Sequence, residues 1–351
     1  MSDVPTAGGA EPLRHNGANG ATGGVHRIRD TDGTAQVRKV LLAPGSRASP
    51  AGWAASDNPG HWNYWRREAE VHADRELAGS LRDTGLRLPH LDRVDPGPAE
   101  VTLWFWDETG RTLDQLDLDD HRRVARGVGR WQARGAICAP WASRNYLRTY
   151  IAAKDVDWSL LDDDAAWSQL LVRRHFPAAL RSGWLDLVGH QERLLGVVEG
   201  SPRVMCHLDL WPGNVIAPAD EDVVVLDWAF AGDVAVGEDV GNWVPDSCLD
   251  LSWPAARIAE LDATVLGAYL EGLRSAGWRG DAGRVRLAMR ASCVKYAWLL
   301  PRMLERAGEP EQYAYYQQVD ADRLFHERGL VLMHLLGWYR EALELAERLG
   351  P

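Results

Sequence analysis

The sequence predicts an α+β fold of two lobes, a small β-rich N-terminal lobe with one long helix and a larger, mainly helical C-terminal lobe. Three observations support this prediction. Strand-like patterns dominate up to residue 106, helical periodicity dominates after it, and a short β island interrupts the helices near 204–226. We expect residues 1–12 to form a disordered tail, 13–106 the first lobe and 107–351 the second.

The first lobe should contain a β-hairpin over 25–42. Asp32-Gly33 is a favoured tight turn, and β-rich stretches flank it. Lys39 on the second stretch shares a face with its apolar neighbours, because side chains alternate along a strand. A helix over 59–82 should follow, begun by the Asn58-Pro59 pair.

After a strand at 101–105 the chain changes to helical periodicity. Asp119 is the expected cap of a helix that Gly135 ends. Near the C-terminus two apolar stripes recur at helical spacing. Their members are Ile258, Leu261, Val265, Tyr269 and Leu273, then Leu332, Leu335, Leu336 and Tyr339.

Composition excludes several classes of protein. The net charge of −11 argues against a general nucleic-acid binder. No apolar run reaches the about 18 residues of a membrane helix, and the first thirty residues lack the apolar core of a signal peptide. We therefore expect a cytoplasmic protein with reduced thiols at Cys138, Cys206, Cys248 and Cys293.

One segment carries recognisable chemistry. Residues 207–214 read H-L-D-L-W-P-G-N on a turn, and an apolar strand at 223–226 then delivers Asp227 beside that turn. Phosphoryl transfer needs a carboxylate against the attacking hydroxyl and oxygen ligands for Mg²⁺. Asp209 is our candidate for the first role, and Asn214 and Asp227 for the second. The alternative is that these side chains only satisfy backbone groups of a loop.

The pattern H-x-D-x-x-x-x-N followed by D-W-x-x-x-G resembles the catalytic core of the aminoglycoside phosphotransferase and choline kinase families, relatives of protein kinases. The matching residues are His207, Asp209, Asn214, Asp227, Trp228 and Gly232. The resemblance implies a protein-kinase-like fold, Asp209 as catalytic base, Asn214 and Asp227 as Mg²⁺ ligands, and His207 as a structural brace. Leu208 departs from the family, which usually has glycine there.

The resemblance also places the nucleotide, ATP or another nucleoside triphosphate, in the first lobe. The chain has only three lysines, Lys39, Lys154 and Lys295, and Lys39 is alone in the first 150 residues. It should meet the phosphates and pair with Glu68, or else with Glu70.

Two further segments have expected supporting roles. Residues 16–24 lie where a phosphate-covering loop belongs, so Gly20, Gly23 and Gly24 are candidate nucleotide contacts; a flexible tail is the alternative. Asp239 is the candidate carboxylate that braces the 207–214 turn by resemblance, with helix capping as the competing interpretation.

The expected function is ATP- and Mg²⁺-dependent phosphorylation of a hydroxyl on a small molecule. Candidate substrate contacts are Trp211, Asp157 and Asp246, because acidic and aromatic groups suit a cationic ligand. The first hypothesis is an antibiotic, of aminoglycoside or nucleoside type, in resistance or self-resistance. The second is a metabolic kinase of a sugar, amino sugar or amino alcohol. The third is a catalytically inactive kinase-like binding module, against which the intact motif argues. The oligomeric state and the choice between ATP and GTP stay open.

Overall fold

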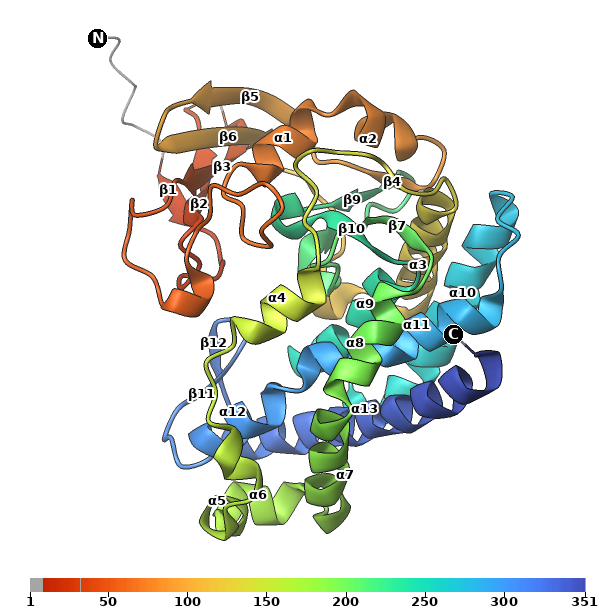
Figure 1. Cartoon of the computed structure of the whole chain (residues 1–351). Coiled ribbons are helices and arrows are strands. Elements are labelled where there is room, and N and C mark those ends of the chain that lie inside the picture. The colour runs from red at the N-terminus through yellow and green to blue at the C-terminus, as the bar shows by residue number, and fades with distance from the viewer. Residues whose placement is uncertain (1–8, 32, 351) are drawn as a thin grey trace.

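The computed structural model describes residues 9–31 and 33–350. It confirms the predicted fold class. A five-stranded sheet and two short helices form the N-terminal lobe, drawn at the top of Figure 1, and helices dominate the lobe below it.

The N-terminal sheet has the strand order β1-β2-β3-β6-β5, and every neighbouring pair is antiparallel. Its strands are β1 (Ala10–Pro12), β2 (Thr22–Arg29), β3 (Ala35–Leu42), β5 (Leu91–Pro96) and β6 (Glu100–Trp106). The predicted hairpin is β2–β3. Gly33 in its turn has a φ of 89°, and Asp32 lies outside the described residues. Lys39 is central in the sheet, opposite Val25 on β2 and Leu103 on β6.

Two predictions for this lobe are wrong. Ala10–Pro12 pair with β2 as strand β1 instead of belonging to a disordered tail, while residues 1–8 lie outside the described residues. The single helix expected over 59–82 is two helices, α1 (Arg67–Ala73) and α2 (Arg75–Ser80). Asp74 separates them because its backbone is extended and its carboxylate accepts the N–H groups of Glu76 and Leu77, which caps α2.

One strand of the second lobe precedes β5 and β6, the last two strands of the first-lobe sheet, along the chain. Strand β4 (Leu86–Arg87) pairs in parallel with β9 (Val223–Val225), which also pairs with β8 (Val215–Ile216). A second small sheet joins β7 (Arg203–Cys206) to β10 (Gly232–Ala235). The two small sheets carry the turns that hold the predicted catalytic residues.

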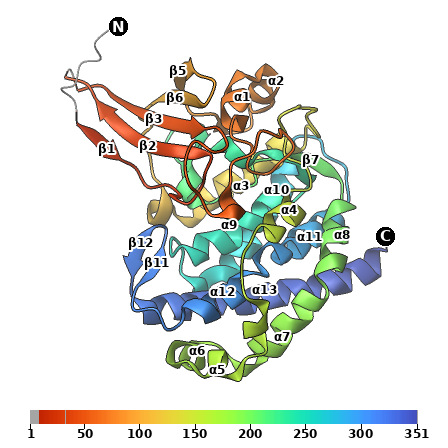
Figure 2. The ribbon, with the colours of Figure 1, turned by 60° about the vertical axis from the view of Figure 1, so that its left-hand side comes forward.

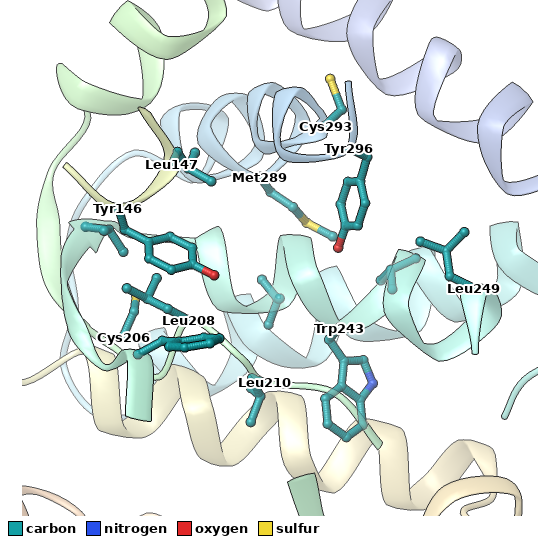
Figure 3. Packing of buried hydrophobic residues seen from close by; sticks show 14 of the residues in the cluster. Tyr146, Leu147, Cys206, Leu208, Leu210, Trp243, Leu249, Met289, Cys293 and Tyr296 are labelled. Carbon is teal, nitrogen blue, oxygen red and sulfur yellow. The ribbon is translucent and has the colours of Figure 1, made fainter. Parts of the chain in front are cut away.

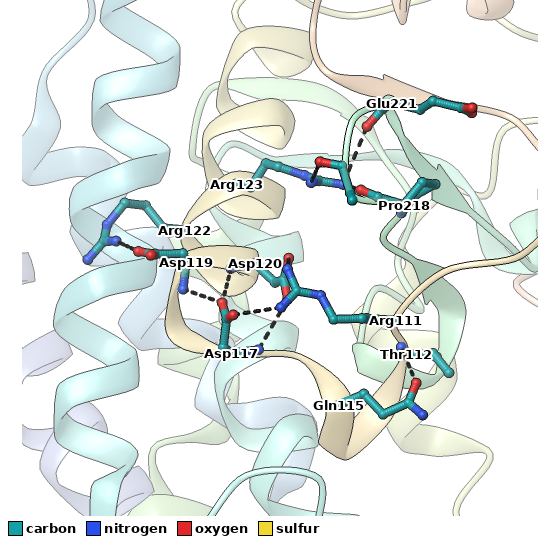
Figure 4. Close-up of polar contacts among 11 residues, drawn as sticks. Arg111, Thr112, Gln115, Asp117, Asp119, Asp120, Arg122, Arg123, Pro218 and Glu221 are labelled. Carbon is teal, nitrogen blue, oxygen red and sulfur yellow. Dashed lines mark hydrogen bonds and ion pairs between the residues drawn. The ribbon is translucent and has the colours of Figure 1, made fainter.

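Helix α3 (Leu118–Gln132) is capped by Asp117 and not by the predicted Asp119. The Asp117 carboxylate accepts from the backbone of Asp119 and Asp120, and Asp120 accepts in return from the backbone of Asp117. Arg111 reaches both Asp117 and Asp120 (Figure 4). Arg123 on the same helix donates to the backbone carbonyl of Pro218, which ties α3 to the β8–β9 connection.

The remaining helices build the core of the C-terminal lobe. They are α4 (Tyr146–Ala152), α5 (Asp164–Ser168), α6 (Leu170–His175), α7 (Ala178–Gly189), α8 (Gln191–Glu199), α9 (Glu238–Leu249), α10 (Ile258–Ser275), α11 (Ala282–Ala291), α12 (Leu299–Arg306) and α13 (Ala321–Leu349). Both predicted apolar stripes are buried, one on α10 and one on α13, which crosses the lower part of the lobe in Figure 2. A hairpin of β11 (Gln312–Ala314) and β12 (Gln317–Val319) joins α12 to α13.

Aromatic and aliphatic side chains fill the space under the 207–214 turn. Figure 3 shows Leu208 and Tyr146 facing the same core as Met289, Tyr296 and Trp243. All four cysteines are free thiols. No helix within residues 9–31 and 33–350 is long and apolar enough to cross a membrane.

Candidate active site

His207 holds the 207–214 turn in place. Its Nε2 lies 2.8 Å from the carbonyl oxygen of Leu226, and its Nδ1 lies 3.3 Å from the backbone nitrogen of Asp209. The ring meets Trp228 edge-on. Burial lowers the pKa of His207 to about 4, so the ring is neutral near pH 7. A neutral ring with both nitrogens engaged suits orientation of the turn rather than proton transfer.

Asp239, in the first turn of α9, contacts the same turn directly. Its two carboxylate oxygens accept the backbone N–H groups of His207 at 2.9 Å and Leu208 at 2.8 Å. Gln132 on α3 donates to Asp239 at 2.8 Å. Asp239 therefore fixes two consecutive peptide groups, which is the geometry that a brace requires.

Leu208 occupies a left-handed conformation with a φ of 69°. This conformation favours glycine, which accounts for the family preference at this position. The leucine side chain is fully buried in the core (Figure 3), so it points away from the approach to Asp209.

Asp209 and Asn214 are held together by two hydrogen bonds. The Asn214 side-chain nitrogen donates to the backbone carbonyl and to Oδ2 of Asp209, both at 2.8 Å. Burial, with the charge of Asp227 added, raises the pKa of Asp209 to about 7. A general base works best with a pKa near the working pH.

Lys39 joins the two lobes through ion pairs. Its Nζ lies 2.5 Å from Glu68 Oε2 and 2.7 Å from Asp227 Oδ1. Burial opposes the charge on the ammonium, but Asp227 and Glu68 raise the pKa of Lys39. Glu70, the alternative partner, accepts a hydrogen bond from the Tyr64 hydroxyl instead. An ammonium has three donors, so the two carboxylates leave one for another oxygen.

Arg67 fixes the start of α1 against the second lobe. Its five N–H donors reach five backbone carbonyls, those of Pro59, His61, Trp62, Trp141 and Ala229, at 2.6–2.8 Å. Ala229 follows Asp227 by two residues, and Arg67 precedes Glu68. This side chain therefore sets the distance between Glu68 and Asp227.

The donor atoms around Asp227 fit a hard divalent cation. The Asp227 side chain is 40% exposed, and Lys39 contacts only its Oδ1. Because the Asn214 nitrogen is bound to Asp209, its side-chain oxygen is the atom that can ligate a metal. The described part of the chain contains no cluster of three His, Cys, Asp or Glu ligands. One carboxylate and one amide oxygen suit Mg²⁺ that shares its coordination with phosphates and water.

Trp211 lies in the 207–214 turn, and its ring packs against the β11–β12 hairpin, which the sequence analysis did not connect with the site. Its ring meets Tyr315 edge-on at 5.0 Å between centroids. The ring also covers Gly213, where a Cβ would collide with it, which explains the glycine in W-P-G-N. Tyr315 and Tyr316 form the β11–β12 turn with φ values of 43° and 59°, a conformation usually given to Asn and Gly.

Tyr316 lies within electrostatic range of the predicted catalytic carboxylates. Burial and the charges of Asp209, Asp250 and Asp227 raise the pKa of the Tyr316 phenol. Two aromatic residues at left-handed turn positions store backbone strain, which is concentrated at functional sites in proteins. The Y-Y pair was the only sequence signal for this turn.

Asp246 is brought to the site together with Lys295, which the sequence analysis did not select. The Lys295 ammonium lies 3.6 Å from Asp246 Oδ2 and donates to Asn242 Oδ1 at 2.9 Å. Asn242 in turn donates to the carbonyl of Leu208 at 3.0 Å. Lys295 is thus linked to the 207–214 turn through one side chain.

Of the other predicted contacts, Asp157 lies outside the site, whereas contacts of Gly20, Gly23 and Gly24 with a nucleotide stay a prediction. Asp157 is exposed, and its carboxylate caps a 3₁₀ turn by accepting from Ser159. A Cβ at Gly20 would lie 2.7 Å from Ser49 Oγ, and one at Gly23 would lie 2.9 Å from a methyl of Val40. These glycines pack against protein atoms, and Gly24 adjoins an irregularity in the β2–β3 register.

The fold and this constellation define a two-lobed phosphotransferase related to protein kinases. A family model described as the phosphotransferase enzyme family, APH, matches residues 59–283, and the chain belongs to that family. It is a kinase that acts on a hydroxyl group of a small molecule. The predicted resemblance is confirmed. A search of curated proteins found no match.

Three solved structures share the fold at low identity. Amicoumacin kinase hAmiN, in complex with AMP-PNP, Ca²⁺ and Ami, is 12% identical over 93% of this chain and 88% of that one, with a TM-score of 0.53. Spectinomycin phosphotransferase APH(9)-Ia, in complex with ADP and spectinomycin, is 12% identical over 95% and 93%, with a TM-score of 0.53. An aminoglycoside phosphotransferase from Alicyclobacillus acidocaldarius is 14% identical over 98% and 97%, with a TM-score of 0.51.

Proposed function

We propose that this kinase uses ATP, or another nucleoside triphosphate, with Mg²⁺ to phosphorylate a hydroxyl of an antibiotic. The observation that carries the proposal is the convergence of three pairs on one site: Lys39 with Glu68, Asp209 with Asn214, and Asp227 with Lys39. The nucleotide and divalent cation in the amicoumacin kinase complex, and the ADP in the spectinomycin phosphotransferase complex, support the choice of co-substrates.

Each proposed role follows from a contact. Asp209 orients the acceptor hydroxyl and takes its proton, because it is the carboxylate that Asn214 holds in the 207–214 turn. Lys39 offers its third donor to a phosphate oxygen while Glu68 holds the ammonium in place. Asp227 and the Asn214 side-chain oxygen hold Mg²⁺, which supplies charge neutralisation for the transferred phosphoryl group. His207 and Asp239 position the turn.

The side chains beside Asp209 favour one of the two antibiotic types. Aromatic rings of Trp211, Tyr315 and Tyr316 offer stacking surfaces for a planar ring. Lys295 offsets part of the negative charge that Asp227 and Asp246 place around Asp209. We therefore place a nucleoside-type antibiotic ahead of an aminoglycoside, with resistance or self-resistance in the cytoplasm as the role.

The test is an ADP-release assay with ATP and Mg²⁺ over nucleoside antibiotics, aminoglycosides, sugars, amino sugars and amino alcohols. We expect turnover of a nucleoside antibiotic, a phosphorylated product by mass spectrometry, and protection of a susceptible host that expresses the chain. Asp209→Asn should lower kcat at least about 100-fold. Preferred turnover of a sugar or amino alcohol without host protection would instead identify a metabolic kinase, and full activity of Asp209→Asn would refute the assignment of the base.

A further inference from the structure

Lys154, just after α4, sits in a box of aromatic rings. Its Nζ lies 3.6 Å from the ring centroid of Tyr150, 4.2 Å from that of Trp53, 5.2 Å from Trp298 and 5.9 Å from Trp62. These residues come from both lobes and from three separate segments of the chain. The box is therefore a feature of the tertiary structure at the junction of the lobes.

The ammonium in this box has no counter-ion. Lys39 and Lys295 have carboxylate partners, whereas no described residue forms an ion pair or hydrogen bond with Lys154 Nζ. Its surroundings are cationic, since Lys295 and Arg302 oppose its charge and only Asp209 favours it. Burial, with these two neighbours, lowers the pKa of Lys154 to about 7.

A second donor in the box also lacks a partner. The indole N–H of Trp298 is buried and finds no acceptor among the described residues. Buried donors are nearly always satisfied in folded proteins, so the Trp298 N–H, beside an ammonium that has no ion-pair partner among the described residues, indicates an acceptor that arrives with a ligand. The rings stabilise a cation from the side but leave the N–H bonds of the ammonium without acceptors.

A chain of contacts connects the box to the turn that carries Asp209. The Tyr150 ring that contacts Lys154 is 5.7 Å from Lys295 Nζ, and Lys295 is linked through Asn242 to the backbone of Leu208. Asp209 is the carboxylate that acts electrostatically on Lys154, while Lys39 is tied to Asp227. Lys39 is therefore positioned to contact the nucleotide phosphates, and Lys154 is positioned to contact the acceptor molecule.

From this geometry we infer that the acceptor carries an anionic oxygen group, a carboxylate or a phosphate ester, and that Lys154 and the Trp298 N–H bind it while Asp209 receives the hydroxyl. The inference rests on the proposed role of Asp209. An oxyanion satisfies both orphan donors and offsets the repulsion between Lys154 and Lys295. A cationic group at this position would add to that repulsion.

Binding is tested without any reaction by NMR on the full chain labelled with ¹³C and ¹⁵N in lysine, which contains only three lysines. Sodium acetate and inorganic phosphate are titrated at constant ionic strength, with sodium chloride as the control. We expect saturable shifts of the Lys154 side-chain resonance, assigned with Lys154→Arg, for acetate or phosphate. A response to one probe identifies its class. No saturable shift, or the same shift with chloride, overturns the inference.

Activity is tested with hydroxyl compounds supplied in pairs, as the carboxylate and as the matching carboxamide. The wild type should prefer the acid at least tenfold in kcat/KM. Lys154→Gln should lose at least tenfold on the acid, through KM, and less than about threefold on the amide; Trp298→Phe, which keeps a ring but loses the donor, should show the same pattern more weakly. Equal losses on both members of a pair would overturn the inference.

Arg302→Gln is the matched control, because it removes a nearby positive charge that pairs with Glu305, while glutamine keeps an N–H donor for the carbonyl of Asp155. It should change KM for the acid less than about threefold, and a change as large as that of Lys154→Gln would show general electrostatics instead of a binding site. If the wild type turns over no acceptor at all, the proposed function fails, and the NMR titration still decides whether the oxyanion site exists.

Discussion

Replacing Arg67 by methionine removes the side chain that ties α1 to the second lobe. All five donors of the guanidinium are used on backbone carbonyls, and Arg67 is fully buried. Burial lowers the pKa of Arg67 to about 9, which shows how much desolvation this position imposes. Arg67→Met keeps most of the buried apolar stem and leaves five carbonyls without their donor.

The loss of unfolding free energy expected for Arg67→Met is the difference between two opposing contributions. Five hydrogen bonds from a charged donor contribute about 1.5–3 kcal/mol each. Burying the guanidinium costs several kcal/mol, and methionine avoids this cost. With the lower figure for each hydrogen bond and a burial cost of about 3.5 kcal/mol, we expect a net loss of about 4 kcal/mol. With an unfolding entropy of about 2.1 cal/mol/K per residue, this loss lowers the Tm of the 351-residue chain by about 5 °C.

The assay combines thermal unfolding with ATP kinetics. Because Arg67 sets the spacing of Glu68 and Asp227 around Lys39, KM for ATP should rise about tenfold. Arg75→Met is the control, since Arg75 is exposed at the start of α2 and its loss should change stability by less than about 0.5 kcal/mol. If Arg67→Met shifts Tm by no more than Arg75→Met and leaves KM unchanged, Arg67 does not hold the lobes.

Three further predictions concern charged groups near the site. Lys39→Met should lower kcat/KM for ATP at least about 100-fold in the ADP-release assay, because Glu68 and Asp227 then lose their shared cation; wild-type kinetics would exclude Lys39 from phosphate binding. Asp239→Asn turns one acceptor oxygen into a donor facing a backbone N–H, so kcat should fall at least about tenfold while KM for ATP changes little; an unchanged kcat would refute the brace. Burial raises the folded-state pKa of Glu238 to about 8 from 4.5, so the folded chain keeps a proton that the unfolded chain releases, and stability falls as pH rises between these values. Glutamine at position 238 is neutral at every pH, so Glu238→Gln has no ionisation to suppress. The Tm of this variant should exceed that of the wild type only slightly at pH 5 and by a few degrees at pH 8; an equal difference at both pH values would contradict this.

The sequence analysis was most accurate where the contacts are local. Residues 207–214 lie within one turn, so the contact between Asp209 and Asn214 follows from a spacing of five residues. Strand alternation correctly placed Lys39 on a buried face of β3, where it is 5% exposed. Fold class also followed from periodicity, since each lobe is dominated by one kind of element.

Some details of the first lobe depend on contacts that residue spacing does not encode. The carboxylate of Asp74 breaks the expected long helix, because it caps a new helix at this position. An aspartate in a sequence can equally well lie inside a continuous helix, so the sequence did not reveal the break. The choice of Glu68 over Glu70 depends on where α1 begins, and Arg67 settles that through carbonyls of both lobes. The close packing of Gly20 against Ser49 and Trp53 is a further contact that the sequence did not reveal.

The sequence by itself determined the fold class, the family and the reacting carboxylate of the proposed mechanism, because those depend on short spacings and on the period of the elements. Only the tertiary structure decided what surrounds the acceptor. Lys154, Trp53 and Trp298 are far apart along the chain, and nothing in their spacing predicts contact. Packing of the two lobes brings them together, and within the described residues it leaves the lysine without an ion pair and the indole N–H without an acceptor.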